Sequence, residues 1–228
     1  MIPGWLHIVS IVWLAVGAAC AIVIAADVVR YPQPMWIMNV VWPVSALFGT
    51  IGVLGQYFTY GRGRGHREVP MAAAVGTGAL HCGSGCTLGD ICAEWLAFFV
   101  PGVAVWFGWH SLFASKMFAV WILDYIVAYA FGIVFQYFSI APMRGLSLGD
   151  GIIAAIKADT LSLTAWQIGM YGFMAVAYFG IFRSGFGVTL ETNSVEFWFT
   201  MQIAMMCGFA TAYPVNWWLI RIGVKERM

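Results

Sequence analysis

Long apolar runs separated by short polar connections constrain this chain more than any other feature. A helix needs about 20 consecutive apolar residues to cross the hydrocarbon core of a bilayer. Runs of that kind recur along the whole sequence, at residues 5–26, 36–60, 71–100, 116–140, 160–182 and 195–220. They predict an all-α, polytopic membrane protein with six transmembrane helices, organised as a single domain over residues 1–228.

The composition agrees with a membrane location. Hydrophobic residues make up 62% of the 228 residues and charged residues 9%, whereas a soluble domain carries about 25% charged residues. The net charge is +1, and the Lys and Arg clusters typical of nucleic-acid-binding proteins are absent from the composition. The expected partner is therefore the lipid bilayer rather than a nucleic acid, and the sequence leaves a homo-oligomer open.

Several local features follow from breakers and connections. Pro43 lies inside the second run and is expected to kink it. The third run is longer than the bilayer core, so its helix is expected to be either tilted or broken among its glycines. Residues 141–159 are interpreted as a turn followed by a short amphipathic helix at the membrane interface, with Asp150, Lys157 and Asp159 on its solvated face.

The distribution of Lys and Arg predicts the orientation. Under six spans, one side of the membrane holds eight such residues and the other holds three. Because cytoplasmic loops carry the excess of positive charge, both termini are expected in the cytoplasm. The larger set is Arg62, Arg64, Arg67, Arg144, Lys157, Arg221, Lys225 and Arg227, and the smaller set is Arg30, Lys116 and Arg183.

A polar motif interrupts the third apolar run. Residues 81–94 read HCGSGCTLGDICAE, and on a helix the four-residue spacing places Cys82, Cys86, Asp90 and Glu94 on one face. Such groups are costly inside a membrane and are usually retained for a function. Asp90 and Glu94, with Asp124 in the fourth run, are predicted to form a proton or ion path. For Asp90, an alternative role is a helix cap.

The two thiols favour a metal over a disulfide. On an intact helix their β-carbons lie about 5–6 Å apart, whereas a disulfide needs about 3.8 Å. Two sulfurs that bind one soft metal ion, with bonds of about 2.3 Å, fit this gap better. His81 is a candidate third ligand if the glycine-rich backbone is unwound. The alternative is that both cysteines are small apolar packing residues.

Methionines provide further soft ligands. Met170 with Met174, and Met201 with Met205, form pairs at helical spacing in the last two runs. Thioethers suit copper(I), although methionine also fills irregular gaps between helices. His7, His66 and His110 share no spacing, so the sequence does not favour haem.

Several stretches resemble a family of small bacterial membrane proteins, domain-of-unknown-function (DUF) family 4396. The resemblance covers residues 31–228 and implies a multi-pass protein of the bacterial inner membrane. Some members of that family are labelled as copper-related, which adds to the ligand argument. The stretches that carry the resemblance are residues 36–44, 81–90, 135–145, 159–163 and 214–218.

Taken together, these patterns favour a transporter or membrane-embedded binding protein for a soft transition metal, with copper(I) as the first choice. Transport or metal binding is favoured over an enzymatic activity. One alternative is a membrane thiol oxidoreductase or metal-dependent redox subunit, which requires a local break in the helix to bring Cys82 and Cys86 together. Another is a non-catalytic assembly or scaffold subunit.

Overall fold

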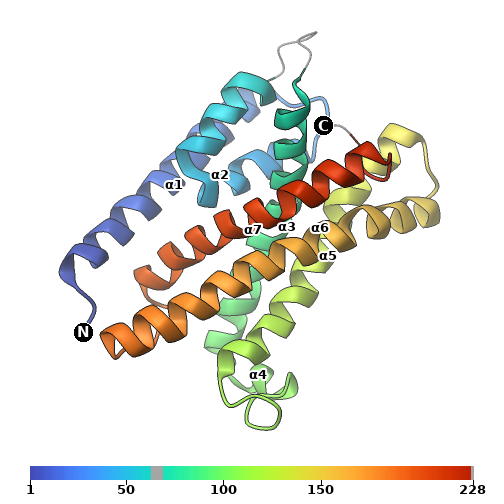
Figure 1. The fold of residues 1–228 in the computed structure, drawn as a ribbon. Coiled ribbons are helices and arrows are strands. Elements are labelled where there is room, and N and C mark those ends of the chain that lie inside the picture. The colour runs from blue at the N-terminus through green and yellow to red at the C-terminus, as the bar shows by residue number, and fades with distance from the viewer. Residues whose placement is uncertain (63–68, 227–228) are drawn as a thin grey trace.

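The structure, a computed structural model, describes residues 1–62 and 69–226 and consists of helices (Figure 1). Arg64, His66, Arg67 and Arg227 lie outside the described residues. Within those ranges the chain forms no β-strand, so the predicted all-α class is confirmed. The elements are α1 (Gly4–Arg30), α2 (Met38–Gln56), η1 (Tyr57–Gly61), α3 (Met71–Phe99), α4 (Gly102–Trp106), α5 (Lys116–Arg144), α6 (Leu148–Ala175), η2 (Val176–Phe186) and α7 (Val195–Arg221).

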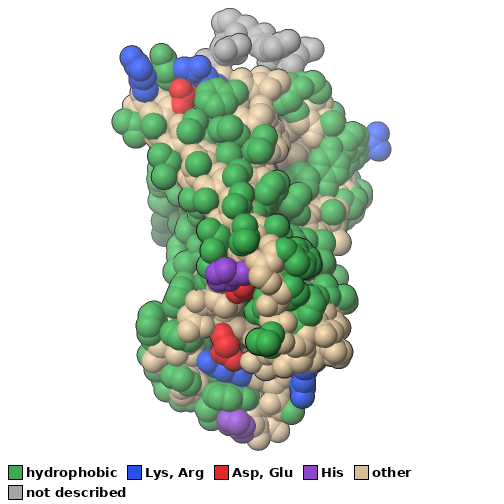
Figure 2. Space-filling model, turned by 90° about the vertical axis from the view of Figure 1, so that its left-hand side faces the viewer, with side chains coloured by type: hydrophobic (Ala, Val, Ile, Leu, Met, Phe, Trp, Pro, Cys, Tyr) green, Lys and Arg blue, Asp and Glu red, His purple; other side chains and the backbone are tan. Residues whose placement is uncertain are grey.

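Five segments are long and apolar enough to cross a membrane: α1, α2 with η1, α5, α6 with η2, and α7. Figure 2 shows apolar side chains over most of the height of one face, with Lys and Arg gathered toward its two ends. The chain is therefore a membrane protein by composition and surface. The helix α3 is not among the five because glycine, hydroxyl and acidic residues interrupt its apolar sequence, so six spans are not confirmed.

The segment made of α2 and η1 reverses direction at Thr50. This residue has non-helical backbone angles, φ 45° and ψ −126°. The ring centroids of Trp42 and Tyr57 are 5.5 Å apart, although fifteen residues of straight helix would separate them by about 22 Å. Gly61 also lies against the Trp42 ring. Residues 38–61 thus form a helical hairpin whose two ends lie at the same end of the bundle. The break falls at Thr50 and not at Pro43, which was expected to kink the helix.

The two termini lie at opposite ends of the bundle (Figure 1). The Met1 ammonium donates a hydrogen bond to the Phe186 carbonyl, at the end of η2. The Arg144 guanidinium, at the end of α5, donates to the Glu226 carboxylate over 2.6 Å. The long helix formed by α6 and η2 separates these two contacts. The prediction that both termini share the cytoplasmic side is not confirmed, because the hairpin at Thr50 makes no net crossing.

The helix α3 runs through the middle of the bundle as one continuous helix over Met71–Phe99, close to its predicted bounds. Its glycines bring it close to α5. A β-carbon on Gly89 would lie 2.5 Å from the α-carbon of Ala128, and one on Gly85 would lie 3.1 Å from the Gly132 nitrogen. Small residues allow such close helix packing in membranes. The glycines therefore serve packing, and the break that was one of two expectations for this helix does not occur.

Residues 141–159 are divided between two long helices. Gly145 ends α5 in a left-handed conformation with φ 60°, and the Ser147 side chain accepts a hydrogen bond from the Asp150 amide to cap α6. The expectation of a solvated face is met by Asp150 and Lys157, which are exposed. It is wrong for Asp159, which is fully buried, because α6 begins twelve residues before the predicted fifth span and carries Asp159 into the bundle.

Candidate functional site

One face of α3 carries polar side chains through the middle of the bundle. We call Cys82, Cys86, Asp90 and Glu94 the α3 polar row. The first three are fully buried and Glu94 is 6% exposed. Their four-residue spacing on an unbroken helix aligns them over about 18 Å. The structure thus brings the predicted thiols and carboxylates onto one buried face.

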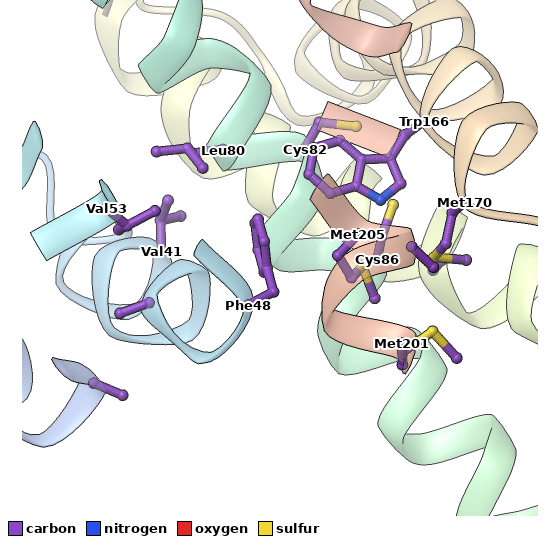
Figure 3. Packing of buried hydrophobic residues seen from close by; sticks show 14 of the residues in the cluster. Val41, Phe48, Val53, Leu80, Cys82, Cys86, Trp166, Met170, Met201 and Met205 are labelled. Carbon is purple, nitrogen blue, oxygen red and sulfur yellow. The ribbon is translucent and has the colours of Figure 1, made fainter. Parts of the chain in front are cut away.

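Sulfur atoms from three helices share the core beside this row. We call the group the sulfur cluster: Cys82 and Cys86 on α3, Met170 and Met174 on α6, and Met201 and Met205 on α7. Figure 3 shows Cys82, Cys86, Met170, Met201 and Met205 in one part of the core, next to Trp166.

One contact lies within the sulfur cluster, and another at its edge joins α3 to α7. Both cysteines are free thiols, and the Cys82 and Cys86 side chains are in contact. The Thr87 hydroxyl lies 4.0 Å from the Met205 sulfur, which holds α7 against α3.

Three carboxyl groups lie close together beyond the cysteines: Asp90 and Glu94 of α3 and Asp124 of α5. Asp90 and Asp124 are fully buried, and none of their oxygens has a hydrogen-bond partner among the described residues. Glu94 accepts a hydrogen bond of 3.0 Å from the Thr192 hydroxyl. These groups, which we call the acid group, are near enough to interact electrostatically. Unpaired buried charge is costly, so these side chains must hold protons or share a cation.

His81 does not join the sulfur cluster. Its Nε2 lies 2.7 Å from the Ser139 hydroxyl, and its ring packs edge-on against Phe135 at 6.0 Å between centroids. Both partners belong to α5. Adjacent side chains on a helix point about 100° apart, and the unwinding that would turn His81 toward Cys82 is absent from the continuous α3.

The sequence interpretation missed an inner polar network around Lys225. This side chain follows α7, yet it is only 2% exposed. Its ammonium donates hydrogen bonds to the Asn216 side-chain oxygen over 2.6 Å and to the Gly78 carbonyl over 3.1 Å. Asp159 lies beside Cys82 and accepts a weak hydrogen bond of 3.4 Å from Gln136.

Burial lowers the pKa of Lys225 below its ordinary value, while the nearby Cys82, Asp159 and Cys86 oppose this shift. The charge count placed Lys225 on the cytoplasmic side of the membrane, where a charged residue is normally solvated, and no local pattern marks it as buried. One sequence pattern could have marked Asp159 as a candidate site residue. It begins residues 159–163, one of the stretches that carry the family resemblance.

A metal site in this region needs methionine as well as cysteine. Across residues 1–62 and 69–226, no three His, Cys, Asp or Glu side chains are grouped so that they could hold a metal ion. The further soft donors that share the core with Cys82 and Cys86 are thioethers. A thiol and thioether set suits a soft monovalent ion such as copper(I) rather than a hard cation.

The fold and this core define a polytopic helical membrane protein with a buried polar interior. The family described as Domain of unknown function (DUF4396) matches residues 71–225, which is more than half of the chain. The protein belongs to this family, as the resemblance predicted. The matched part includes α3, the sulfur cluster, the acid group and Lys225. Comparisons with curated proteins and with solved structures gave no match.

Proposed function

We propose that this protein is a transporter, or a membrane-embedded binding protein, for a soft transition metal ion, with copper(I) as the preferred ion. The observation that supports this most is the buried sulfur cluster, in which Cys82 and Cys86 on α3 meet methionines of α6 and α7. Soft sulfur ligands select copper(I) over the hard cations that bind oxygen. Cys82 and Cys86 are the thiolate ligands, and Met205 is the first choice for a thioether ligand.

Charge balance in the core supports this assignment. Metal binding removes protons from thiols, and two thiolates with one copper(I) carry a net charge of −1. The Lys225 ammonium is close enough to Cys82 and Cys86 to interact with them electrostatically, so it can offset that charge. Two protons are released: the Asp159 carboxylate, which lies beside Cys82, can accept one, and the Asp90 carboxylate, which interacts with Cys86, can accept the other.

The acid group extends the polar core toward the opposite end of the bundle. Glu94 lines a cavity of about 110 Å³ together with Lys116 and Thr192. From Gly78, which accepts a hydrogen bond from Lys225, to Glu94 the helix α3 rises about 24 Å, most of the thickness of a hydrocarbon core of about 30 Å. In this proposal, Asp90, Asp124 and Glu94 carry protons or attract the cation along that length.

The hairpin changes the orientation that we propose. Arg62, Arg144 and Arg221 lie at the end of the bundle that holds the C-terminus, and the Arg62 guanidinium pairs with Asp27 near the end of α1. That end therefore also holds Arg30. By the positive-inside rule, we place the C-terminus in the cytoplasm of a bacterium and the N-terminus on the outer side of the inner membrane.

The decisive test is copper stoichiometry in protein purified without chelators and loaded with copper(I) under anaerobic conditions. We expect wild type to retain copper and the double variant Cys82→Ser, Cys86→Ser to lose it. Cys92→Ser is the matched control, because Cys92 is an exposed residue of the same helix. Unchanged copper in the double variant, with an intact fold, would overturn the proposal, and absence of copper from wild type would favour the scaffold alternative.

The thiol oxidoreductase alternative required a local break in α3, and the helix is continuous across Cys82 and Cys86. On this backbone the two β-carbons are about 5–6 Å apart, which is too far for an unstrained disulfide. No observation here favours a redox role over metal binding. Thiol trapping before and after oxidation checks this point, and we expect both thiols to stay free.

A further inference from the structure

A cavity of about 250 Å³ lies beside the point where α2 reverses. Leu47 and Phe48, just before the reversal, form one wall, and α1, α3 and α7 form the others. Asp90 and Gln202 also line the cavity, whose remaining walls are mainly apolar. Ala18 of α1 lines it and is exposed, so the cavity opens on the surface of the bundle that faces lipid.

Three hydrogen-bond acceptors at this cavity have no partner. Asp90 is fully buried and Gln202 is 6% exposed. Both Asp90 carboxyl oxygens and the Gln202 side-chain oxygen lack hydrogen-bond partners within the described part of the chain. The Gln202 amide nitrogen is used, since it donates to the Leu47 carbonyl. Unpaired buried acceptors are costly, so a ligand that brings donors would satisfy them.

The chemistry of the walls identifies the class of ligand. A primary ammonium carries three N–H donors and a positive charge, which match three acceptors that include a carboxylate. Phe48 and Trp198 line the same space, and their rings give the apolar body of a ligand a surface to pack against. A hard divalent cation would need about six oxygen ligands, more than this cavity offers. A volume of about 250 Å³ also exceeds the share of one water, about 30 Å³.

We propose that this cavity binds small primary amines as ammonium ions, with the ammonium on Asp90 and Gln202 and an apolar body against Phe48 and Trp198. This binding site goes beyond the proposed metal function, and it adjoins the proposed metal site because Met201 and Met205 line the same cavity. Glu94 and Asp124 lie near enough to Asp90 to interact with it electrostatically, and a cation in the cavity would favour the ionised form of these carboxyl groups. A lipid chain in the same space would leave the Asp90 and Gln202 acceptors unpaired.

The test measures binding of radiolabelled phenethylammonium to the full chain in lipid nanodiscs, with 2-phenylethanol as the neutral analogue of the same shape. We expect saturable binding of the amine that exceeds that of the alcohol by about tenfold or more, because charge-assisted hydrogen bonds are lost with the alcohol. Asp90→Asn should reduce amine binding by a similar factor. Asp150→Asn is the control, because Asp150 is exposed at the start of α6.

A second variant protects the test against misfolding of Asp90→Asn. Ala18→Trp places a large ring at the exposed mouth and leaves the Asp90 side chain itself unchanged, and it should also abolish amine binding. Equal binding of amine and alcohol, or amine binding that survives both variants, would overturn the proposal, as would a lipid that co-purifies in the cavity. Copper stoichiometry is measured on the same preparations. Loss of amine binding with copper retained, or the reverse, therefore separates this site from the proposed metal function.

Discussion

The Lys225 ammonium donates a hydrogen bond of 3.1 Å to the backbone carbonyl of Gly78, at a distance of 147 residues in the sequence. This contact joins the end of the chain to the central helix α3. It also places a cation one helical turn from Cys82, since Gly78 precedes Cys82 by four residues. Lys225, four residues beyond the end of α7, is therefore part of the buried core.

Replacing Lys225 should destabilise the protein. In Lys225→Met the Gly78 carbonyl and the Asn216 side-chain oxygen lose a donor, and leaving a buried acceptor unpaired costs about 1–3 kcal/mol. Thermal unfolding in detergent measures the loss. Lys157→Met is the matched control, because Lys157 is exposed, and it should unfold like wild type. Equal unfolding temperatures for the two variants would contradict a structural role for the ammonium.

The same side chain predicts a pH dependence. Burial lowers the pKa of Lys225 in the folded protein, whereas an unfolded lysine has a pKa of about 10.4. Between these two values the unfolded state binds more protons, so the contribution of Lys225 to stability rises with pH. Below the folded pKa this contribution is constant. The difference in unfolding temperature between wild type and Lys225→Met should therefore grow as the pH rises toward about 10.4, and a constant difference would contradict the assignment.

Packing between α5 and α6 gives a third prediction. A β-carbon on Gly132 would lie 2.0 Å from an oxygen of Asp159, so Gly132→Ala must displace the buried carboxylate. We expect a loss of about 1–3 kcal/mol from overpacking. Gly172→Ala on α6 meets no atom within 4 Å and should instead gain about 0.5–1 kcal/mol in a helix interior. Unfolding temperatures of the two variants should thus move in opposite directions.

The reversal at Thr50 can be checked by labelling. In a Cys92→Ser background, Tyr31→Cys and Tyr60→Cys introduce thiols at exposed positions on either side of the hairpin. Both should react with an impermeant reagent applied from the side of the C-terminus. A tag on Met1 should be reached only from the other side. If α2 crossed the membrane straight, the two new cysteines would be labelled from opposite sides.

Two adjacent methionines, one buried and one exposed, provide a variant and its matched control for the proposed copper site. Met205 is 2% exposed in the sulfur cluster, whereas Met206 is 50% exposed on the outer side of α7. Leucine has a similar volume but no thioether, so core packing should change little. We expect Met205→Leu to weaken copper(I) binding by about tenfold, which corresponds to about 1.4 kcal/mol, and Met206→Leu to leave it unchanged. Competition with a coloured copper(I) chelator measures both affinities.

The sequence was sufficient for features that depend on local pattern. Apolar length predicted α3 within one residue at its C-terminal end, and the four-residue spacing placed Cys82, Cys86, Asp90 and Glu94 on one face. The sequence did not predict that residues 38–61 form a helical hairpin. Residues 38–61 are apolar and long enough to cross a membrane, and nothing in that pattern distinguishes a straight helix from one that turns back at Thr50.

The remaining differences come from tertiary contacts. Asp159 and Lys225 look like solvated residues by their neighbours in the sequence, and only the packing of α6 and of the chain end against α3 buries them. His81 was paired with Cys82 because they are adjacent in the sequence, whereas its hydrogen bond to Ser139 on α5 fixes it on another face. A single-sequence pattern contains no information about such partners.

The reversal at Thr50 also has an electrostatic consequence. Its first half-helix ends inside the bundle with its carbonyls, which carry partial negative charge, and its second half-helix begins there with its amides, which carry partial positive charge. Because the two halves run in opposite directions, their dipoles largely cancel at the surface. Within about one turn of Thr50 they do not cancel, so the interior of the bundle beside this buried residue contains a fixed local field that requires no ionised side chain.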